Sequence, residues 1–151
     1  MTIEFIWAWG GLALATIVCV AALIWGGSTE RMIAITLWVA WVVSLLVESH
    51  GPKGPGDQVI LIDVFVLLVF IGVSLKTRRL WTLFATASQV DDVASHFGAR
   101  LLHWGLYSYI TATGIWGGYF LIGCILAGIV GHRRRLGRNG ASPVRLNASA
   151  G

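Results

Sequence analysis

The sequence predicts an all-α integral membrane protein, a helical bundle of five transmembrane helices. Hydrophobic residues make up 56% of the 151 residues and charged residues 12%, about half the charged fraction of a typical soluble domain. The apolar residues are gathered into runs close to the length of about 20 residues that crosses the hydrocarbon core of a bilayer. Two of these runs end in basic clusters, as the cytoplasmic ends of transmembrane helices commonly do.

The first predicted span covers residues 5–26, an uninterrupted apolar run. Trp7 lies near one end and Trp25 at the other, so a helix places them about 27 Å apart, close to the spacing of the two aromatic belts of a bilayer. Before the run there is an acid, Glu4, and no lysine or arginine, unlike a cleaved secretory signal. We therefore expect this helix to remain in the mature protein.

Three further spans are predicted at residues 32–47, 59–75 and 107–131. The loop "ESHGPKGPGDQ" ends the second span, because its glycines and prolines cannot continue a helix. The third is interrupted by Asp63 and closed by "KTRR", and the last is closed by "HRRRLGR". We expect residues 1–138 to form one transmembrane domain. Residues 139–151 are small and polar, which predicts a disordered cytoplasmic tail.

Residues 80–97 are less apolar, and the basic residues decide their placement. The positive-inside rule assigns both basic clusters to the cytoplasm, where Lys76, Arg78, Arg79, Arg133, Arg134 and Arg135 act as anchors. Two clusters on one side require an even number of crossings between them, so residues 80–97 should cross as well. This places the N-terminus outside, the C-terminus in the cytoplasm and nine of the 11 basic residues inside. The alternative is four spans plus an interfacial amphipathic helix.

Polar residues in this fourth segment fall on one side of a helix. At 100° per residue, a single stripe contains Gln89, Asp92, His96, Arg100 and His103, with Asp91 outside it. Two charged aspartates near the bilayer centre would cost about 5 to 7 kcal/mol. We therefore expect the stripe to face other helices and outside water rather than lipid.

Further polar residues map to the same outer side: Glu48 and His50 after the second span, and Asp63 near the start of the third. Together with the stripe they form a candidate polar cluster that could bind a cation, relay protons or hold a metal ion. The alternative is that these groups only hydrogen-bond the helices together and meet water. No cofactor is predicted, although His50 and His96 could be considered for haem, and the face of Trp38 and Trp41 for a quinone.

The last span carries a ridge of small residues, namely Gly114, Gly118, Gly123, Ala127 and Gly131. Small residues let a neighbouring helix approach closely, which favours association in a bilayer. The ridge predicts a partner helix in the same molecule, in another copy or in another membrane subunit. The arginine-rich segment follows a span directly, so it is interpreted as a contact for lipid head groups rather than for nucleic acid.

The second half of the chain contains "RRLWTLFATASQV", then a histidine-bearing helix, then "YITATGIWGGY". In these segments it resembles small multi-pass inner-membrane proteins of proteobacteria, a group without assigned activity. The resemblance implies a bacterial inner-membrane location and no residue roles.

The sequence favours an accessory or interaction subunit of a membrane complex, because it has a small-residue ridge and no catalytic motif. It therefore argues against an enzyme. The alternative is a membrane protein that binds a small solute, proton or cofactor through Asp63, Asp92 and His96. This alternative requires Asp63 and His96 to face each other within the bundle.

Overall fold

The structure is a computed structural model that describes residues 3–47, 57–102 and 106–140. Its described elements are all helical, which confirms the all-α helical bundle. The first four helices are α1 (Ile3–Trp25), α2 (Ser28–Val47), α3 (Asp57–Thr77) and α4 (Leu80–Leu101). A last rod joins α5 (Leu106–Thr113), a π-helical segment η1 (Gly114–Phe120) and α6 (Leu121–Gly140).

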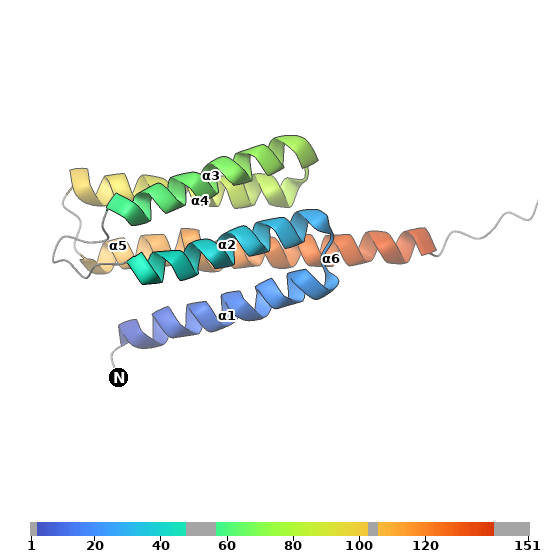
Figure 1. Ribbon diagram of the computed structural model, residues 1–151, viewed down its shortest axis with the longest axis horizontal. Helices are drawn as coiled ribbons and strands as arrows, with labels where there is room; N and C mark the ends of the chain where they lie inside the picture. Colours follow the sequence, from blue (N-terminus) through green and yellow to red (C-terminus); the bar gives the residue numbers. More distant parts are fainter. Residues whose placement is uncertain (1–2, 48–56, 103–105, 141–151) are drawn as a thin grey trace, which may run out of the picture.

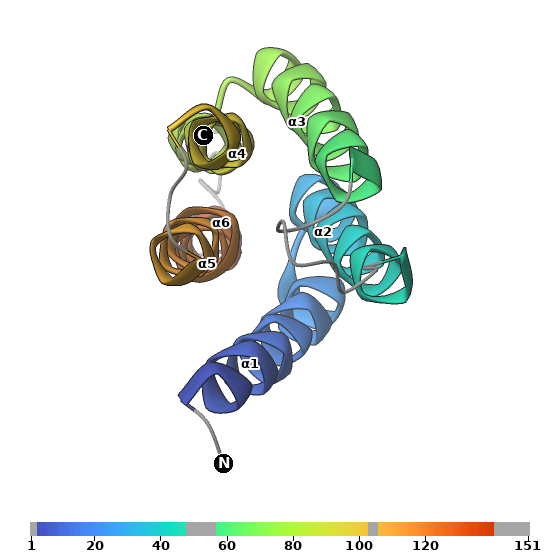
Figure 2. The same ribbon diagram turned by 90° about the vertical axis from the view of Figure 1, so that its left-hand side faces the viewer.

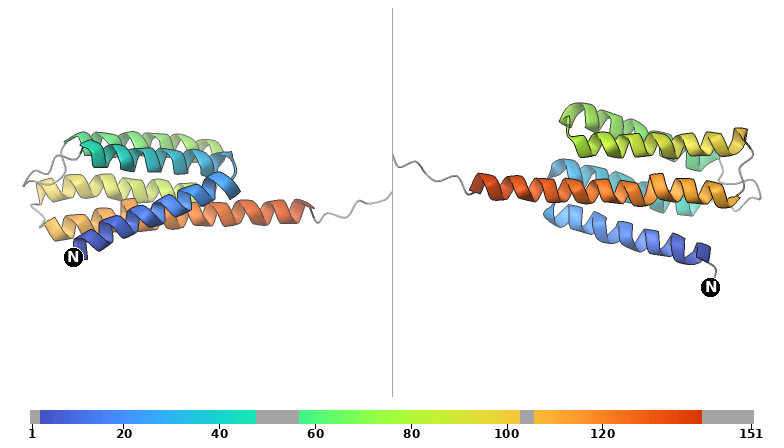
Figure 3. Two further views of the ribbon diagram at one scale, coloured as in Figure 1. Left: turned by 60° about the horizontal axis from the view of Figure 1, so that its bottom comes forward. Right: turned by 180° about the vertical axis from the view of Figure 1, so that it is seen from behind.

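Successive helices run in opposite directions along one common axis (Figure 1). Seen along that axis, α1, α2 and α3 form a curved row, and α4 and α6 lie on its concave side (Figure 2). The last rod contacts α1, α2 and α4, so it closes the bundle. α4 lies side by side with α3 and α6, not across the ends of the other helices (Figure 3).

The alternation places the basic segments at one end of the bundle. The α1–α2 turn, the α3–α4 turn and the C-terminal end of α6 share that end, and α6 extends beyond it (Figure 1). We call it the basic end. Arg78 in the α3–α4 turn has a φ of 50°, the left-handed conformation that tight helix–helix turns use.

α2 begins at Ser28, about one turn before the predicted start at residue 32. The cause is a side-chain cap that hydropathy does not register. The carboxylate of Glu30 accepts a hydrogen bond from the backbone N–H of Gly27 at 3.1 Å, and the carbonyl of Gly27 accepts from Arg31 N–H at 3.0 Å. The first backbone N–H groups of a helix have no acceptor within the helix, and a Glu side chain that reaches back to them supplies one. The last helix likewise continues past residue 131, to Gly140.

The interior is close-packed and the outside is apolar. Small residues such as Ala15, Ala22 and Ala34 are buried where helices meet, with Phe70 and Ile125 filling the larger spaces. Many large apolar side chains are exposed, up to 80% for Leu46. In the part of the chain that the structure describes, three helical segments are long and apolar enough to cross a membrane: Ser28–Val47, Asp57–Thr77 and Ser108–Arg138. The segment Trp9–Trp25 of α1 is apolar but shorter.

α4 has its polar side inward and its apolar side outward. Its buried polar residues are Thr82, Ser88, Gln89, Asp92, Ser95 and His96, which we call the α4 polar row. Its exposed residues include Leu83, Phe84, Val90 and Phe97. A helix on the surface of a soluble protein has the reverse arrangement. The composition of α4 alone does not mark it as a span.

Candidate functional site

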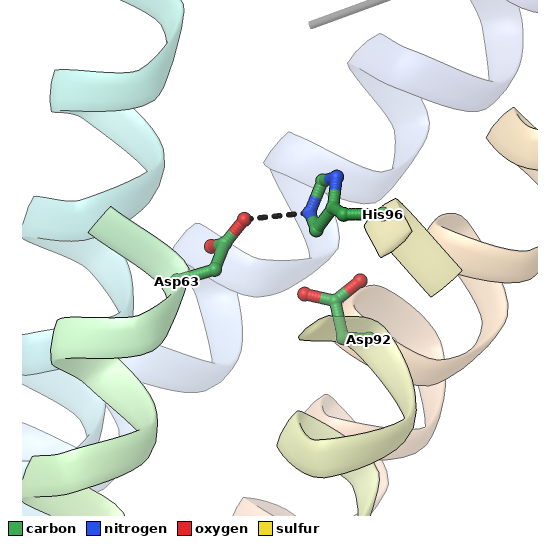
Figure 4. A group of neighbouring side chains, drawn as sticks. All are labelled: Asp63, Asp92 and His96. Atoms are coloured by element: carbon green, nitrogen blue, oxygen red, sulfur yellow. Dashed lines mark hydrogen bonds and ion pairs between the residues drawn. The ribbon is translucent and has the colours of Figure 1, made fainter. Parts of the chain in front are cut away.

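Two helices bring an aspartate and a histidine into direct contact inside the bundle. Asp63 lies on α3 about two turns from its start, and His96 lies on α4 near its end. Because α3 and α4 are antiparallel neighbours, these positions are at the same level. Nε2 of His96 lies 2.8 Å from Oδ2 of Asp63, and the histidine is only 4% exposed (Figure 4).

Asp92 lies one helical turn before His96 and points into the same space (Figure 4). It is 6% exposed, and the side-chain amide of Gln89 donates to its Oδ2 at 3.4 Å. One ligand atom each from Asp63, Asp92 and His96 can be chosen so that all three lie within 4.8 Å of one another. We call these three residues the Asp/His site.

The second ring nitrogen of His96 is also bonded. The hydroxyl of Tyr109, on α5, lies 2.7 Å from Nδ1 of His96, and the two rings are 5.5 Å apart between centroids. With both nitrogens engaged, the imidazole is held in one orientation, with Nε2 directed at Asp63. Such second contacts are how proteins fix the ring of a functional histidine.

The last rod fits closely against Asp92. A Cβ atom added to Gly117 in η1 would lie 2.5 Å from Cγ of Asp92, so any side chain at 117 would displace the carboxylate. One residue earlier, the carbonyl of Trp116 accepts a hydrogen bond from the Ser88 hydroxyl of α4. π-helical turns leave backbone groups outside the regular helical pattern and often occur at functional sites. Here the π-helical segment supplies the space for the Asp92 carboxylate, at Gly117, and the carbonyl that accepts from Ser88, at Trp116.

The site has more acidic groups than basic ones. Among the described residues, His96 is the only basic side chain that forms an ion pair with either carboxylate. Asp92 therefore has an amide as its hydrogen-bonding neighbour and no arginine or lysine of the described chain in ion-pair contact. Two nearby carboxylates away from water repel each other and favour uptake of a proton or a cation.

The structure brings together four of the predicted cluster residues: Asp63, Gln89, Asp92 and His96. Arg100 is not among them, because it is exposed and pairs with Asp57 at 2.5 Å near the surface. The stripe thus divides into a buried part and an exposed end. Glu48, His50 and His103 lie outside the described residues.

Sequence reasoning missed Tyr109, Ser88 and Gly117. A tyrosine within an apolar span was the available signal for the first, because a buried phenol requires a hydrogen-bond partner. The hydroxyl of Ser88 lies beside the predicted stripe, and its acceptor is a backbone carbonyl that no pattern in the sequence identifies. Gly117 gave no signal beyond its neighbour Gly118, which was assigned to the ridge.

A second buried acid lies at the basic end of the bundle. Glu30 is 0% exposed and its carboxylate binds the Arg79 guanidinium at 2.7 Å, joining the α1–α2 turn to the α3–α4 turn. Arg79, expected as an anchor, is therefore also a partner for a buried charge. Arg133 lies over the ring of Trp25 at 5.6 Å, a cation–π contact that ties α6 to α1.

The two polar ends are connected by the α4 polar row. At its start, the Thr82 hydroxyl lies 3.3 Å from that of Thr77, close to the Arg79 turn. Thr86 donates to the carbonyl of Phe70 on α3 at 3.2 Å. Ser88 and Gln89 continue the row to the Asp/His site. Polar side chains thus recur along the inward side of α4, some against α3 and some against the last rod.

The small-residue ridge is only partly used within the chain. Gly118 is buried, and an added Cβ would lie 3.7 Å from Trp41. Gly123 and Ala127 are exposed, and an added Cβ at Gly123 or Gly131 would have no other atom within 4 Å. Gly114 is half-buried. Close contacts inside the bundle are made instead by Gly117 and by Gly128, the latter against Trp81 of α4.

Chemically, two carboxylates and an oriented imidazole can exchange a proton or coordinate a cation. The phenol of Tyr109 and the amide of Gln89 hold two of these groups in place. Comparison of the chain with protein-family models, curated proteins and solved structures found no match.

Proposed function

We propose that this chain is a multi-pass protein of a bacterial inner membrane that transfers protons or small cations through the Asp/His site. One observation carries the proposal: Asp63, Asp92 and His96 converge in the bundle, and within the described ranges the imidazole is the only basic group in ion-pair contact with either carboxylate. Ionisable residues that face the interior of a membrane bundle are costly, and they typically serve ion pathways or proton relays.

The distribution of side chains supports a bilayer as the solvent. Large apolar residues cover the outside of the described helices, and several polar side chains, among them Glu30, Gln89 and Asp92, are buried inside. In water this arrangement would expose far more apolar surface than a soluble monomer usually does. α4 follows the same rule, with Phe84 and Phe97 outward and Gln89 inward. We therefore assign α4 as a span, beside α1, α2, α3 and the last rod, despite its three charged residues.

The direction of the helices supports the orientation. The turn at Arg31, the turn at Arg79 and the arginines of α6 all lie at the basic end. With that end in the cytoplasm, the positive-inside rule is satisfied and the N-terminus lies outside. The Asp/His site is then nearer the outer surface, and the α4 polar row leads from it towards the cytoplasm.

A flux assay on the full-length protein in liposomes tests this function. We expect trapped dyes for protons, Na⁺ or a divalent cation to report flux above that of empty vesicles. Asp92→Asn should abolish it, because the amide cannot take up a proton or attract a cation. Asp91→Asn is the matched control, since Asp91 is the adjacent, exposed acid. Equal signals from the wild type and Asp92→Asn with all three dyes would contradict the proposal.

A second candidate function, the interaction subunit, is supported by the outer face of α6. Gly123 and Ala127 are exposed there, and Gly123 meets no other side chain of the described chain. In lipid such a face suits a second helix. Cross-linking in native membranes tests it: Gly123→Leu should remove a cross-linked partner or dimer band. If cross-linking of the wild-type protein gave only the monomer band, that result would argue against this function.

A further inference from the structure

We infer that the Asp/His site binds one divalent transition-metal ion through a carboxylate oxygen of Asp63, a carboxylate oxygen of Asp92 and Nε2 of His96. The inference rests on the proposed function in one respect, that a cation binds at this site. It goes further by naming the class of ion, the ligand atoms and the groups that orient them.

The donor atoms are spaced for a metal ion. Protein ligands lie about 2.0 to 2.2 Å from zinc, so tetrahedral donor atoms are about 3.4 Å from one another. Nε2 of His96 and Oδ2 of Asp63 are 2.8 Å apart, and the whole set of three lies within 4.8 Å. These separations bracket the value of about 3.4 Å that a tetrahedral ion requires, so the three donors lie close to the spacing of a metal site.

The charge of the site selects a divalent ion. Two carboxylates and a neutral imidazole carry two negative charges, which a divalent cation neutralises completely. A monovalent cation would leave one unpaired negative charge between the helices, which is costly in a membrane interior. The described residues offer no arginine or lysine in ion-pair contact with Asp63 or Asp92 that could act instead.

The surroundings orient the ligands before an ion arrives. Tyr109 is bonded to Nδ1 of His96, which leaves Nε2 directed at the carboxylates. Histidines that bind metals almost always have such a partner on the other nitrogen. Gln89 similarly holds Oδ2 of Asp92. Gly117 leaves space beside Asp92 that any side chain would occupy.

The donor set indicates the kind of ion. One imidazole nitrogen with two carboxylate oxygens suits ions that accept both donor types, such as Zn²⁺, Mn²⁺ or Co²⁺, better than Ca²⁺ or Mg²⁺, which prefer oxygen. Three protein ligands leave at least one coordination position open, as in exchangeable or catalytic zinc sites. An ion held this way can leave, or can take water as a further ligand.

Titration with Co²⁺ tests the inference, because bound Co²⁺ reports its ligands in the visible spectrum. The full-length protein, carrying no histidine tag, is stripped with a chelator in detergent and titrated. We expect one Co²⁺ per chain, displaced by Zn²⁺. Asp63→Asn and His96→Gln should each weaken binding by at least about 10- to 100-fold, the loss that removal of only an outer-shell partner of a metal ligand typically causes. Asp91→Asn, an exposed acid on the same helix, should leave it unchanged.

Circular dichroism and gel filtration verify that each variant is folded. If Asp63→Asn does not fold, Gly117→Ala provides the second variant: it adds one methyl group against Asp92 and should also weaken Co²⁺ binding. Wild-type protein that binds no Co²⁺, or equal affinity in the wild type, His96→Gln and Asp91→Asn, would overturn the inference.

The outcomes separate this inference from the proposed function. Flux that depends on Asp92 in chelator-treated protein, together with no Co²⁺ binding, would support transfer and exclude the metal site. One tightly bound Co²⁺ that requires His96, without any flux, would support the metal site and exclude transfer.

Discussion

Glu30 and Asp92 are both buried acids, but their partners differ. Glu30 has a guanidinium at 2.7 Å and a backbone N–H at 3.1 Å, so its charge is compensated within the fold. Asp92 has an amide at 3.4 Å, and the nearby imidazole is paired with Asp63. A compensated acid stabilises a turn, whereas an uncompensated one favours binding. This contrast is why the function is assigned to the Asp/His site and not to the basic end.

The Glu30–Arg79 pair predicts a stability effect. Arg79→Met leaves the fully buried carboxylate without its cation and should lower the free energy of unfolding by about 3 to 5 kcal/mol. Glu30→Gln should have a smaller effect, because its amide oxygen can still accept from Gly27 N–H. Unfolding in detergent with added denaturant measures both.

Lys76→Met serves as the control for the Arg79 variant, since Lys76 is an exposed basic residue at the same end of the bundle. In the double variant Glu30→Gln/Arg79→Met, part of the lost stability should return, because no unpaired charge remains. A similar, small effect for Arg79→Met and Lys76→Met would mean that the pair contributes little.

At the scale of helices, the contact between α4 and α6 depends on a glycine. A Cβ at Gly128 would lie 2.8 Å from Cε2 of Trp81, so Gly128→Ala forces the indole or the helices apart. We expect a loss of about 1 to 3 kcal/mol from such overpacking. Gly123→Ala on the same helix meets open space and should be neutral or slightly stabilising. The midpoints of thermal unfolding of the two variants measure the difference, and equal midpoints would contradict a close contact between Gly128 and Trp81.

Helix existence and the inward stripe followed from the sequence because both depend on local periodicity. At 100° per residue, Gln89, Asp92 and His96 share one face of a helix regardless of which helices lie next to it. In the proposed bilayer, a face with these polar groups is expected to turn towards the interior of the bundle and away from lipid. The contact of Asp63 with His96 was a stated requirement of one hypothesis, and the structure meets it. That pairing was open to prediction because antiparallel neighbours bring the start of one helix level with the end of the next.

Features that depend on exact register between distant helices could not be predicted. Tyr109 meets His96 only through the relative heights of α4 and α5, which periodicity along the sequence does not determine. The π-helical segment changes the rotation per residue, so α-helical periodicity could not indicate that Gly117 faces Asp92. The start of α2 was missed because Glu30 was interpreted as part of a polar turn and not as its cap.

At the scale of the molecule, the bundle places its polar groups in two separate layers. The Glu30–Arg79 pair joins the turns at the basic end, and the Asp/His site joins α3, α4 and α5 towards the other end. Between them the core is mostly apolar except along α4. The two layers therefore differ in kind: an arginine balances the buried acid at the basic end, whereas the Asp/His site has a carboxylate without such a partner among the described residues.

The orientation predicts which residues a reagent outside the cell can reach. In a background with Cys19→Ala and Cys124→Ala, single cysteines replace Lys76, Arg100 or Arg135, which are all exposed near helix ends. A membrane-impermeant maleimide should label Arg100→Cys in intact spheroplasts, and the other two only after permeabilisation. Five spans require this pattern, because α4 then carries the chain from the cytoplasm to the outside. Removing Arg100 breaks only a surface ion pair with Asp57, which contributes little to folding.

If α4 were interfacial, the cysteines at 76 and 100 would label from the same side and the cysteine at 135 from the opposite side. That result would remove α4 from the membrane and, with it, the argument that Asp92 and His96 form a site within the bilayer.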